Sequence, residues 1–139
     1  MVSWRDHVFR DRPHLDAVDS KGDYRKATAV TQSTAGKQEM PHIMWWQLRE
    51  GISPEDLEMR SFGYADCAIE SYKKYKRQKE AGATNADNKF MAAIPSPFNM
   101  LNSATAPWDR MLVEPTYEAQ MRREIDRIAA AISHDGLAI

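Results

Sequence analysis

Residues 89–102 read K-F-M-A-A-I-P-S-P-F-N-M-L-N, a short apolar run that ends in Pro-Ser-Pro. The run from Phe90 to Ile94 shows no alternation with polar residues, which is typical of a parallel strand buried on both faces. Loops at the carboxyl ends of such strands carry the ligand sites of α/β barrels. The stretch therefore predicts a buried strand that opens into a functional loop.

Helical patterns flank this strand. One runs from Gly63 to Glu80, with Gly82 as its natural end. A second is predicted after Pro115, and its apolar face repeats at helical spacing: Tyr117, Met121, Ile125, Ile128 and Ile132. The segment 137–139 resembles the opening of another buried strand. Strands that alternate with helices predict a parallel sheet, so the expected fold class is helix-rich α/β, a partial (β/α)8 barrel.

The first part of the chain is less regular. Residues 1–15 have the apolar spacing of a short helix, whereas residues 16–38 turn polar and predict a mobile loop. The segment 43–48 is too apolar to remain in water, and the Ser-Pro pair at 53–54 predicts the start of a short helix. We therefore expect a single incomplete barrel domain over residues 1–139, with the loop within it.

Charge and cysteine content limit the possible partners. Nineteen basic and twenty acidic residues give a net charge of −1, so neither nucleic acid nor a membrane is an expected partner. The basic run from Lys73 to Lys79 is predicted to be a solvated helix surface. The single cysteine, Cys67, forms no internal disulfide and is expected to be buried, and no secretory signal is visible. A reducing, cytoplasmic location is therefore expected.

Four stretches, residues 4–13, 63–72, 89–99 and 117–139, resemble the superfamily of cobalamin-independent methionine synthase and uroporphyrinogen decarboxylase. The resemblance implies a (β/α)8 barrel, which usually needs about 250 residues. The family's first strand is expected before Met1, and its later strands after Ile139. The resemblance therefore implies a truncated barrel protein.

The resemblance also bears on activity. It implies methyl transfer or decarboxylation of a small organic substrate, provided that other chains complete the barrel. The family's zinc ligands come from later strands that this chain lacks, and the single cysteine and four histidines show no ligand spacing, so no metal site is expected. The catalytic residues and any cofactor stay unassigned.

The candidate substrate site consists of Ser96, Phe98 and Asn99. Ser96 and Asn99 offer hydrogen bonds, and Phe98 offers an apolar wall at the carboxyl end of the predicted strand. The alternative is structural: the prolines set a turn, and Asn99 caps the short segment that follows.

A second candidate lies around His42, Trp45 and Trp46. These side chains form either a stacking platform for a flat ligand or an anchor that holds the long loop on the barrel. Residues 43–48 are also a candidate surface for a partner protein. In addition, a sheet of two or three strands leaves unpaired edges, so self-association is expected.

Three functional hypotheses follow. The chain is an enzyme that assembles its pocket from several copies, a noncatalytic interaction protein, or a remnant without independent activity.

Overall fold

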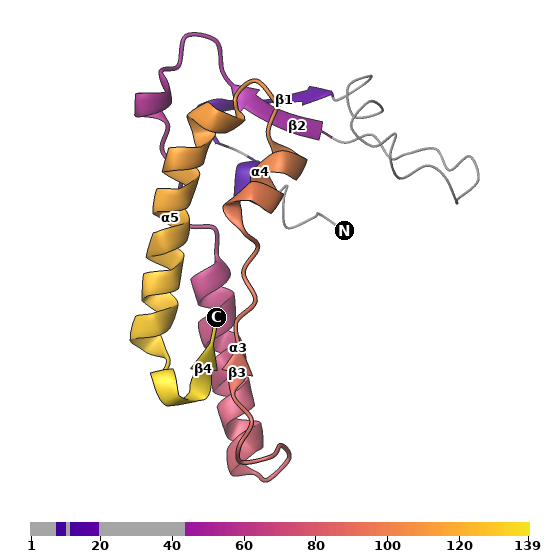
Figure 1. Cartoon of the computed structure of the whole chain (residues 1–139), viewed down its shortest axis with the longest axis vertical. Helices are drawn as coiled ribbons and strands as arrows, with labels where there is room; N and C mark the ends of the chain where they lie inside the picture. The colour runs from indigo at the N-terminus through magenta and orange to yellow at the C-terminus, as the bar shows by residue number, and fades with distance from the viewer. Residues whose placement is uncertain (1–7, 11, 20–43) are drawn as a thin grey trace, which may run out of the picture. The chain divides into compact units, whose positions relative to one another are not determined.

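The computed structural model describes residues 8–10, 12–19 and 44–139 (Figure 1). The chain divides into two compact units. Unit 1 comprises residues 1–57 and 98–113, and unit 2 comprises residues 58–97 and 114–139.

Unit 1 contains an antiparallel pair of strands. β1 (Leu15–Asp19) pairs with β2 (Met44–Leu48), with Leu15 opposite Leu48 and Asp19 opposite Met44. Aromatic residues such as those in the Met-Trp-Trp-Gln-Leu segment favour the pleated, half-buried surface of a strand. The loop predicted over residues 16–38 is therefore wrong at its beginning, because residues 16–19 belong to β1. The remainder of that prediction lies outside the described residues.

The predicted short helix within residues 1–15 agrees with the structure only in part, because Leu15 already belongs to β1, whereas the helix start predicted at 53–54 is confirmed. Val8 and Phe9 are helical and fully buried, while Trp4 lies outside the described residues. The short 3-10 helix η1 (Pro54–Asp56) begins as the Ser-Pro pair predicts: Ser53 Oγ accepts a hydrogen bond from the Glu55 amide at 3.4 Å.

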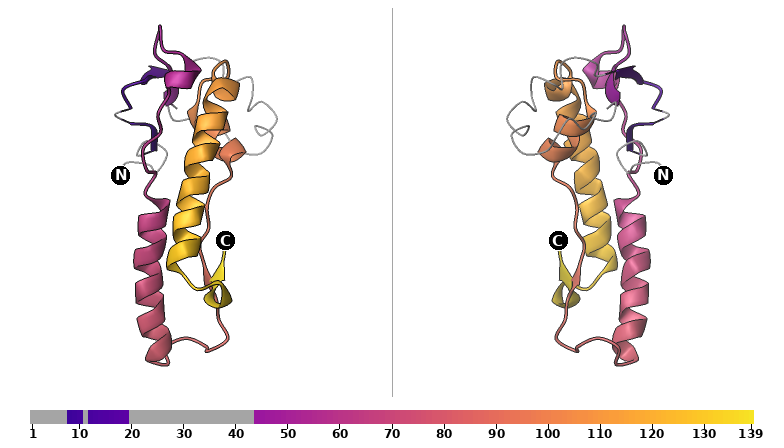
Figure 2. Two further views of the ribbon diagram at one scale, coloured as in Figure 1. Left: turned by 90° about the vertical axis from the view of Figure 1, so that its left-hand side faces the viewer. Right: turned by 90° about the vertical axis from the view of Figure 1, so that its right-hand side faces the viewer.

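Unit 2 contains the long helix α3 (Tyr64–Glu80), which confirms the helix predicted over 63–80. Gly63 precedes it with φ 79°, and Gly82 follows with φ 72°. Both values lie in the left-handed region that glycine adopts without steric cost, and this explains the sharp limits of the helix. Figure 2 shows α3 running beside the later helix of the same unit.

That later helix, α5 (Arg110–Ala131), begins ahead of its predicted start after Pro115. The amides of Leu112 and Val113 both donate to the Asp109 carbonyl at 3.0 Å, which starts the helix at this point. Pro115 then lies inside the helix, where it lacks the amide that would bond four residues back. The division between the two units falls next to this proline, between Val113 and Glu114.

A small parallel sheet completes unit 2. β3 (Phe90–Met91) pairs with β4 (Leu137–Ala138), with Phe90 opposite Leu137 and Met91 opposite Ala138. The Ala92 amide extends the pairing by donating to the Ala138 carbonyl at 2.9 Å. The predicted parallel pairing of these two segments is confirmed.

The prediction of a partial (β/α)8 barrel is wrong. The described residues form two separate two-stranded sheets, β1–β2 antiparallel and β3–β4 parallel, and no barrel-like arrangement of strands. The physical reason lies in the run itself, which alternates despite its apolar composition. Phe90 and Ala92 join the core, whereas Met91 is 71% exposed, so only one face of this sheet is covered. Pro95 and Pro97 then lack the amides that would continue the pairing.

The core of unit 2 lies between its helices and the inner face of β3–β4. Its buried centre and the apolar residues around it come from α3, α5, β3 and β4 and from the residues that directly follow β3 and α5: Ala65, Ala68, Tyr72, Phe90, Ala92, Ile94, Ile128, Ile132 and Leu137. Nearby, the ring of Phe62 stacks on that of Tyr117 with centroids 4.7 Å apart. Cys67 does not join this core: contrary to prediction, it is exposed.

Candidate functional site

The predicted substrate residues gather at the start of a helix. Ser96 directly precedes α4 (Pro97–Ala104), and Phe98 and Asn99 lie in its first turn. Ser96 and Asn99 are exposed, and the Phe98 side chain is 71% exposed. Since β3 ends at Met91, these residues do not stand at the carboxyl end of a barrel strand. Asn99 lies in the first turn of α4, and the capping role expected of it stays a prediction. Ligand binding at these residues stays a prediction.

The two tryptophans of β2 have mainly structural roles. Trp45 is buried and meets the ring of Trp108 edge-on, with centroids 6.3 Å apart. Trp46 is half-buried, and its carbonyl accepts a hydrogen bond from the Ala106 amide at 3.0 Å. Trp45 is too buried to contact a partner directly, and partner binding through residues 43–48 stays a prediction, as do the stacking and anchoring interpretations. His42 lies outside the described residues.

An apolar surface in unit 1 does reach solvent, at the start of α5. Trp108 is 57% exposed, Met111 83% and Leu112 44%. Met111 and Leu112 lie in the first turn of α5, and Trp108 lies in the turn that directly precedes this helix. We call these three residues the apolar surface of unit 1. Sequence reasoning missed it because the helix was expected to begin only after Pro115.

The charged residues within this stretch are tied to the backbone of unit 1. Asp109 Oδ2 accepts a hydrogen bond from the Leu48 amide at 2.8 Å. Arg110 donates to the carbonyl of Asn102 at 2.9 Å and to that of Thr105 at 3.3 Å. Because both ionic groups are held in this way, the side chains left to face water at this point are apolar.

The most constrained ionisable group of unit 2 is Glu124 on α5, whose side chain is fully buried. Its carboxylate accepts hydrogen bonds from the Phe62 and Ala65 amides at 2.8 Å, from Ser61 Oγ at 2.8 Å and from Gln120 Nε2 at 3.1 Å. The amides lie at the start of α3, where Gly63 has no side chain that could cap them. Glu124 therefore caps α3 from a different helix.

These contacts determine the protonation state of Glu124. Burial by itself raises the pKa of the carboxyl, but the hydrogen bonds from Ala65, Ser61 and Phe62 outweigh burial and leave the pKa below its usual range. Arg127 Nη1 stands 3.9 Å from the carboxylate and favours the same ionised form. Glu124 is therefore a charged structural group at neutral pH.

A pH dependence of stability follows. The folded-state pKa of Glu124 lies below the ordinary value of 4.5. The contribution of Glu124 to the free energy of unfolding is therefore complete above pH 4.5 and is lost as the pH falls through the folded-state pKa. We expect the free-energy difference between the wild type and Glu124→Gln to shrink as the pH falls below 4.5. Urea unfolding of both proteins across a pH series measures this difference. A constant difference across the series would contradict the assignment.

Two general properties concern the whole described part of the chain. Among residues 8–10, 12–19 and 44–139, no three histidine, cysteine, aspartate or glutamate side chains are grouped so that they could hold a metal ion. No helix within those ranges is long and apolar enough to cross a membrane.

The chain matches no family model, no curated protein and no solved structure. The resemblance to the methionine synthase and uroporphyrinogen decarboxylase superfamily therefore stays a prediction from residues 4–13, 63–72, 89–99 and 117–139.

Proposed function

We propose that this chain is a noncatalytic interaction protein that associates with a second copy of itself through the apolar surface of unit 1. The observation that carries the proposal is the exposure of Trp108, Met111 and Leu112 at the start of α5 and in the turn before it. Large apolar side chains grouped on a surface favour association, because burying them removes apolar area from water. The position of the Trp108 ring is also held by its edge-on contact with the buried ring of Trp45.

A second copy is the favoured occupant for an electrostatic reason. The net charge of −1 gives two copies almost no mutual repulsion, and proteins with a net charge near zero tend to associate. A two-fold symmetric dimer also brings the same surface together twice, so Met111 and Leu112 of each copy are covered at once. Three side chains per copy form a small interface, so the dimer is weak and depends on concentration.

An enzymatic role has less support. A ligand pocket buries most of its ligand, whereas Ser96, Phe98 and Asn99 are all exposed. Methyl transfer or decarboxylation at these residues therefore rests on the family resemblance alone.

The proposal predicts that Met111→Lys combined with Leu112→Lys weakens self-association at least about tenfold, because the change removes two apolar contacts and places like charges opposite each other. Sedimentation velocity over a concentration series measures the effect. The matched control is Met91→Lys combined with Ile139→Lys, since both of those residues are exposed and apolar but belong to unit 2.

The control variant is expected to associate like the wild type. If it dissociates instead, the contact between copies lies at β3–β4 and the proposal is wrong. A wild-type chain that stays monomeric throughout the series also refutes it.

A further inference from the structure

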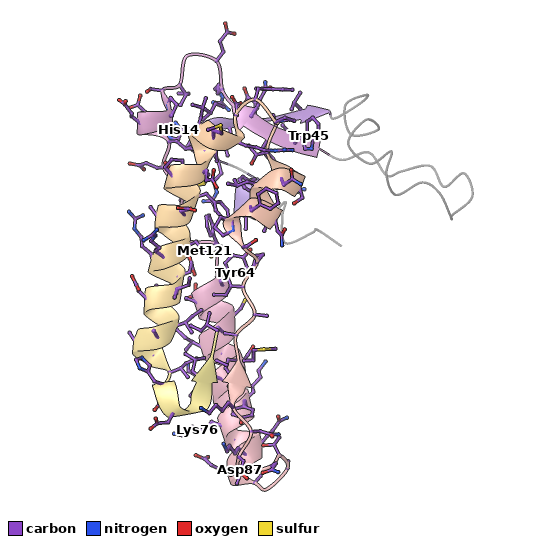
Figure 3. All side chains as sticks on the ribbon, viewed as in Figure 1. His14, Trp45, Tyr64, Lys76, Asp87 and Met121 are labelled. Carbon is purple, nitrogen blue, oxygen red and sulfur yellow. The ribbon has the colours of Figure 1, made fainter. Side chains whose placement is uncertain are left out.

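The strongest charge asymmetry of the described residues lies at the end of α3 and in the loop that follows. Between residues 73 and 89 the chain carries six basic and two acidic side chains, although the whole chain has a net charge of −1. We call the six basic residues the basic end of unit 2, and Lys76 and Asp87 mark its position in Figure 3. They are Lys73, Lys74, Lys76, Arg77, Lys79 and Lys89.

The loop is fixed against the side of α3 that carries Tyr75 and Lys79. Lys79 Nζ donates to the Asn88 carbonyl at 2.7 Å and lies 5.8 Å from the centre of the Tyr75 ring. The Tyr75 hydroxyl donates to the same carbonyl. Because Asn88 is held in this way, its neighbour Lys89 is kept near the last turns of α3.

Carboxylates of unit 2 compensate this charge only in part. Lys73 pairs with Glu70 at 2.7 Å and Lys76 with Glu80 at 4.0 Å, but both pairs are exposed and therefore weak. Within the part of the chain that the structure describes, Lys74 and Arg77 form no ion pair. The hydrogen bond and charge of Lys73 lower the pKa of Glu70, and Lys74 and Arg77 add to the effect, as expected in a region of positive potential.

The aromatic residues of this region discriminate between anionic partners. Tyr72 and Tyr75 interleave with the basic residues, and such rings can stack on the bases of single-stranded nucleic acid. Here both rings pack on Phe90 instead, with centroids 5.5 and 5.6 Å away, so they are engaged in unit 2 itself. The surface therefore presents positive charges but no free aromatic ring on which a base could stack. Such a surface fits the carboxylates of a protein better than the bases of a nucleic acid.

We propose that the basic end of unit 2 binds an acidic segment of a partner protein. Carboxylates of that segment pair with Lys74 and Arg77, which are exposed and lie one turn apart on α3. The interaction is mainly electrostatic, so it is strong at low ionic strength and is screened by salt. It is independent of self-association through the apolar surface of unit 1.

The test measures binding of the full-length protein to a fluorescent poly-L-glutamate peptide by anisotropy, at low and at physiological salt. Lys74→Glu combined with Arg77→Glu is expected to lower the affinity at least about tenfold. The matched control is Arg60→Glu combined with Arg122→Glu, which makes the same change in net charge at two exposed arginines of the same unit. The control is expected to change the affinity less than about threefold.

Three results would overturn the proposal: no binding of poly-L-glutamate at low salt, equal losses in both variants, or tighter binding of single-stranded DNA of the same charge that also depends on Lys74 and Arg77. The third result would identify a nucleic acid as the partner. The Met111→Lys, Leu112→Lys variant is expected to bind the peptide like the wild type, so failure of one proposal does not imply failure of the other.

Discussion

Replacing Glu124 with alanine is expected to lower the free energy of unfolding by about 3 kcal/mol. The substitution removes the acceptor of hydrogen bonds from the Phe62 and Ala65 amides and from Ser61 and Gln120. Amides left buried without an acceptor lose their hydration and gain nothing in return. The Ala65 amide at the start of α3 would lose its acceptor, and Gly63 has no side chain that could replace it.

The matched control for this prediction is Glu118→Ala on the same helix. Glu118 is partly exposed and stands 4.0 Å from Arg122, so its loss is expected to cost less than about 1 kcal/mol. Urea unfolding gives both values, and hydrogen exchange at the Ala65 amide reports the loss of the cap directly. Similar losses in the two variants would show that Glu124 has no special role.

Replacing Ile128 with alanine is the second large change, with an expected loss of about 3 kcal/mol. Ile128 is fully buried and packs with Ala92 and Ile132 on the inner face of β3–β4. The cavity left by the substitution lies under the parallel sheet, which has only two strands and depends on the helices beneath it.

Hydrogen exchange supplies a second measurement for this variant. The Ala92 amide donates to the Ala138 carbonyl at 2.9 Å, so its exchange is expected to become about a hundredfold faster when the sheet is destabilised. Ile125→Ala is the matched control, because Ile125 lies on the same helix but is only half-buried. Unchanged exchange at Ala92, or an equal loss of stability in the control, would contradict the role assigned to Ile128.

Local signals in the sequence were sufficient for several elements. Gly63 and Gly82 mark the limits of α3, and the Ser-Pro pair at 53–54 marks the start of η1. The two glycines act through their own backbone conformation, and Ser53 acts through a hydrogen bond to a residue two positions away. Such features are nearly independent of the rest of the fold, and for this reason they could be read from the sequence.

The barrel could not be excluded in the same way. An apolar run such as Phe90–Ile94 fits a strand buried on both faces, but it also fits a strand whose outer face is simply uncovered. Composition does not distinguish the two, because alanine and methionine occur in both environments. The exposure of Met91 decides the matter, and that exposure depends on what the remaining chain places beside the sheet.

The exposure of the candidate surface residues could not be predicted from the sequence either. The sequence directed attention to Trp45, which the fold buries, and not to Trp108, which it leaves largely exposed. A carboxylate at Glu124, on the apolar face shared by Tyr117 and Ile128, was a readable sign that a buried charge needs partners. Its partners lie about sixty residues earlier in the chain, and no local pattern identifies them.

The sequence by itself determined where α3 begins and ends, which segments form β3 and β4, and that these two strands run in the same direction. Only the tertiary structure decided that the sheet has one covered face, that Glu124 caps a distant helix, and that the start of α5 exposes Met111. The reason is physical: backbone preferences act over a few residues, whereas burial and the pairing of buried charges depend on neighbours that come together only when the chain folds.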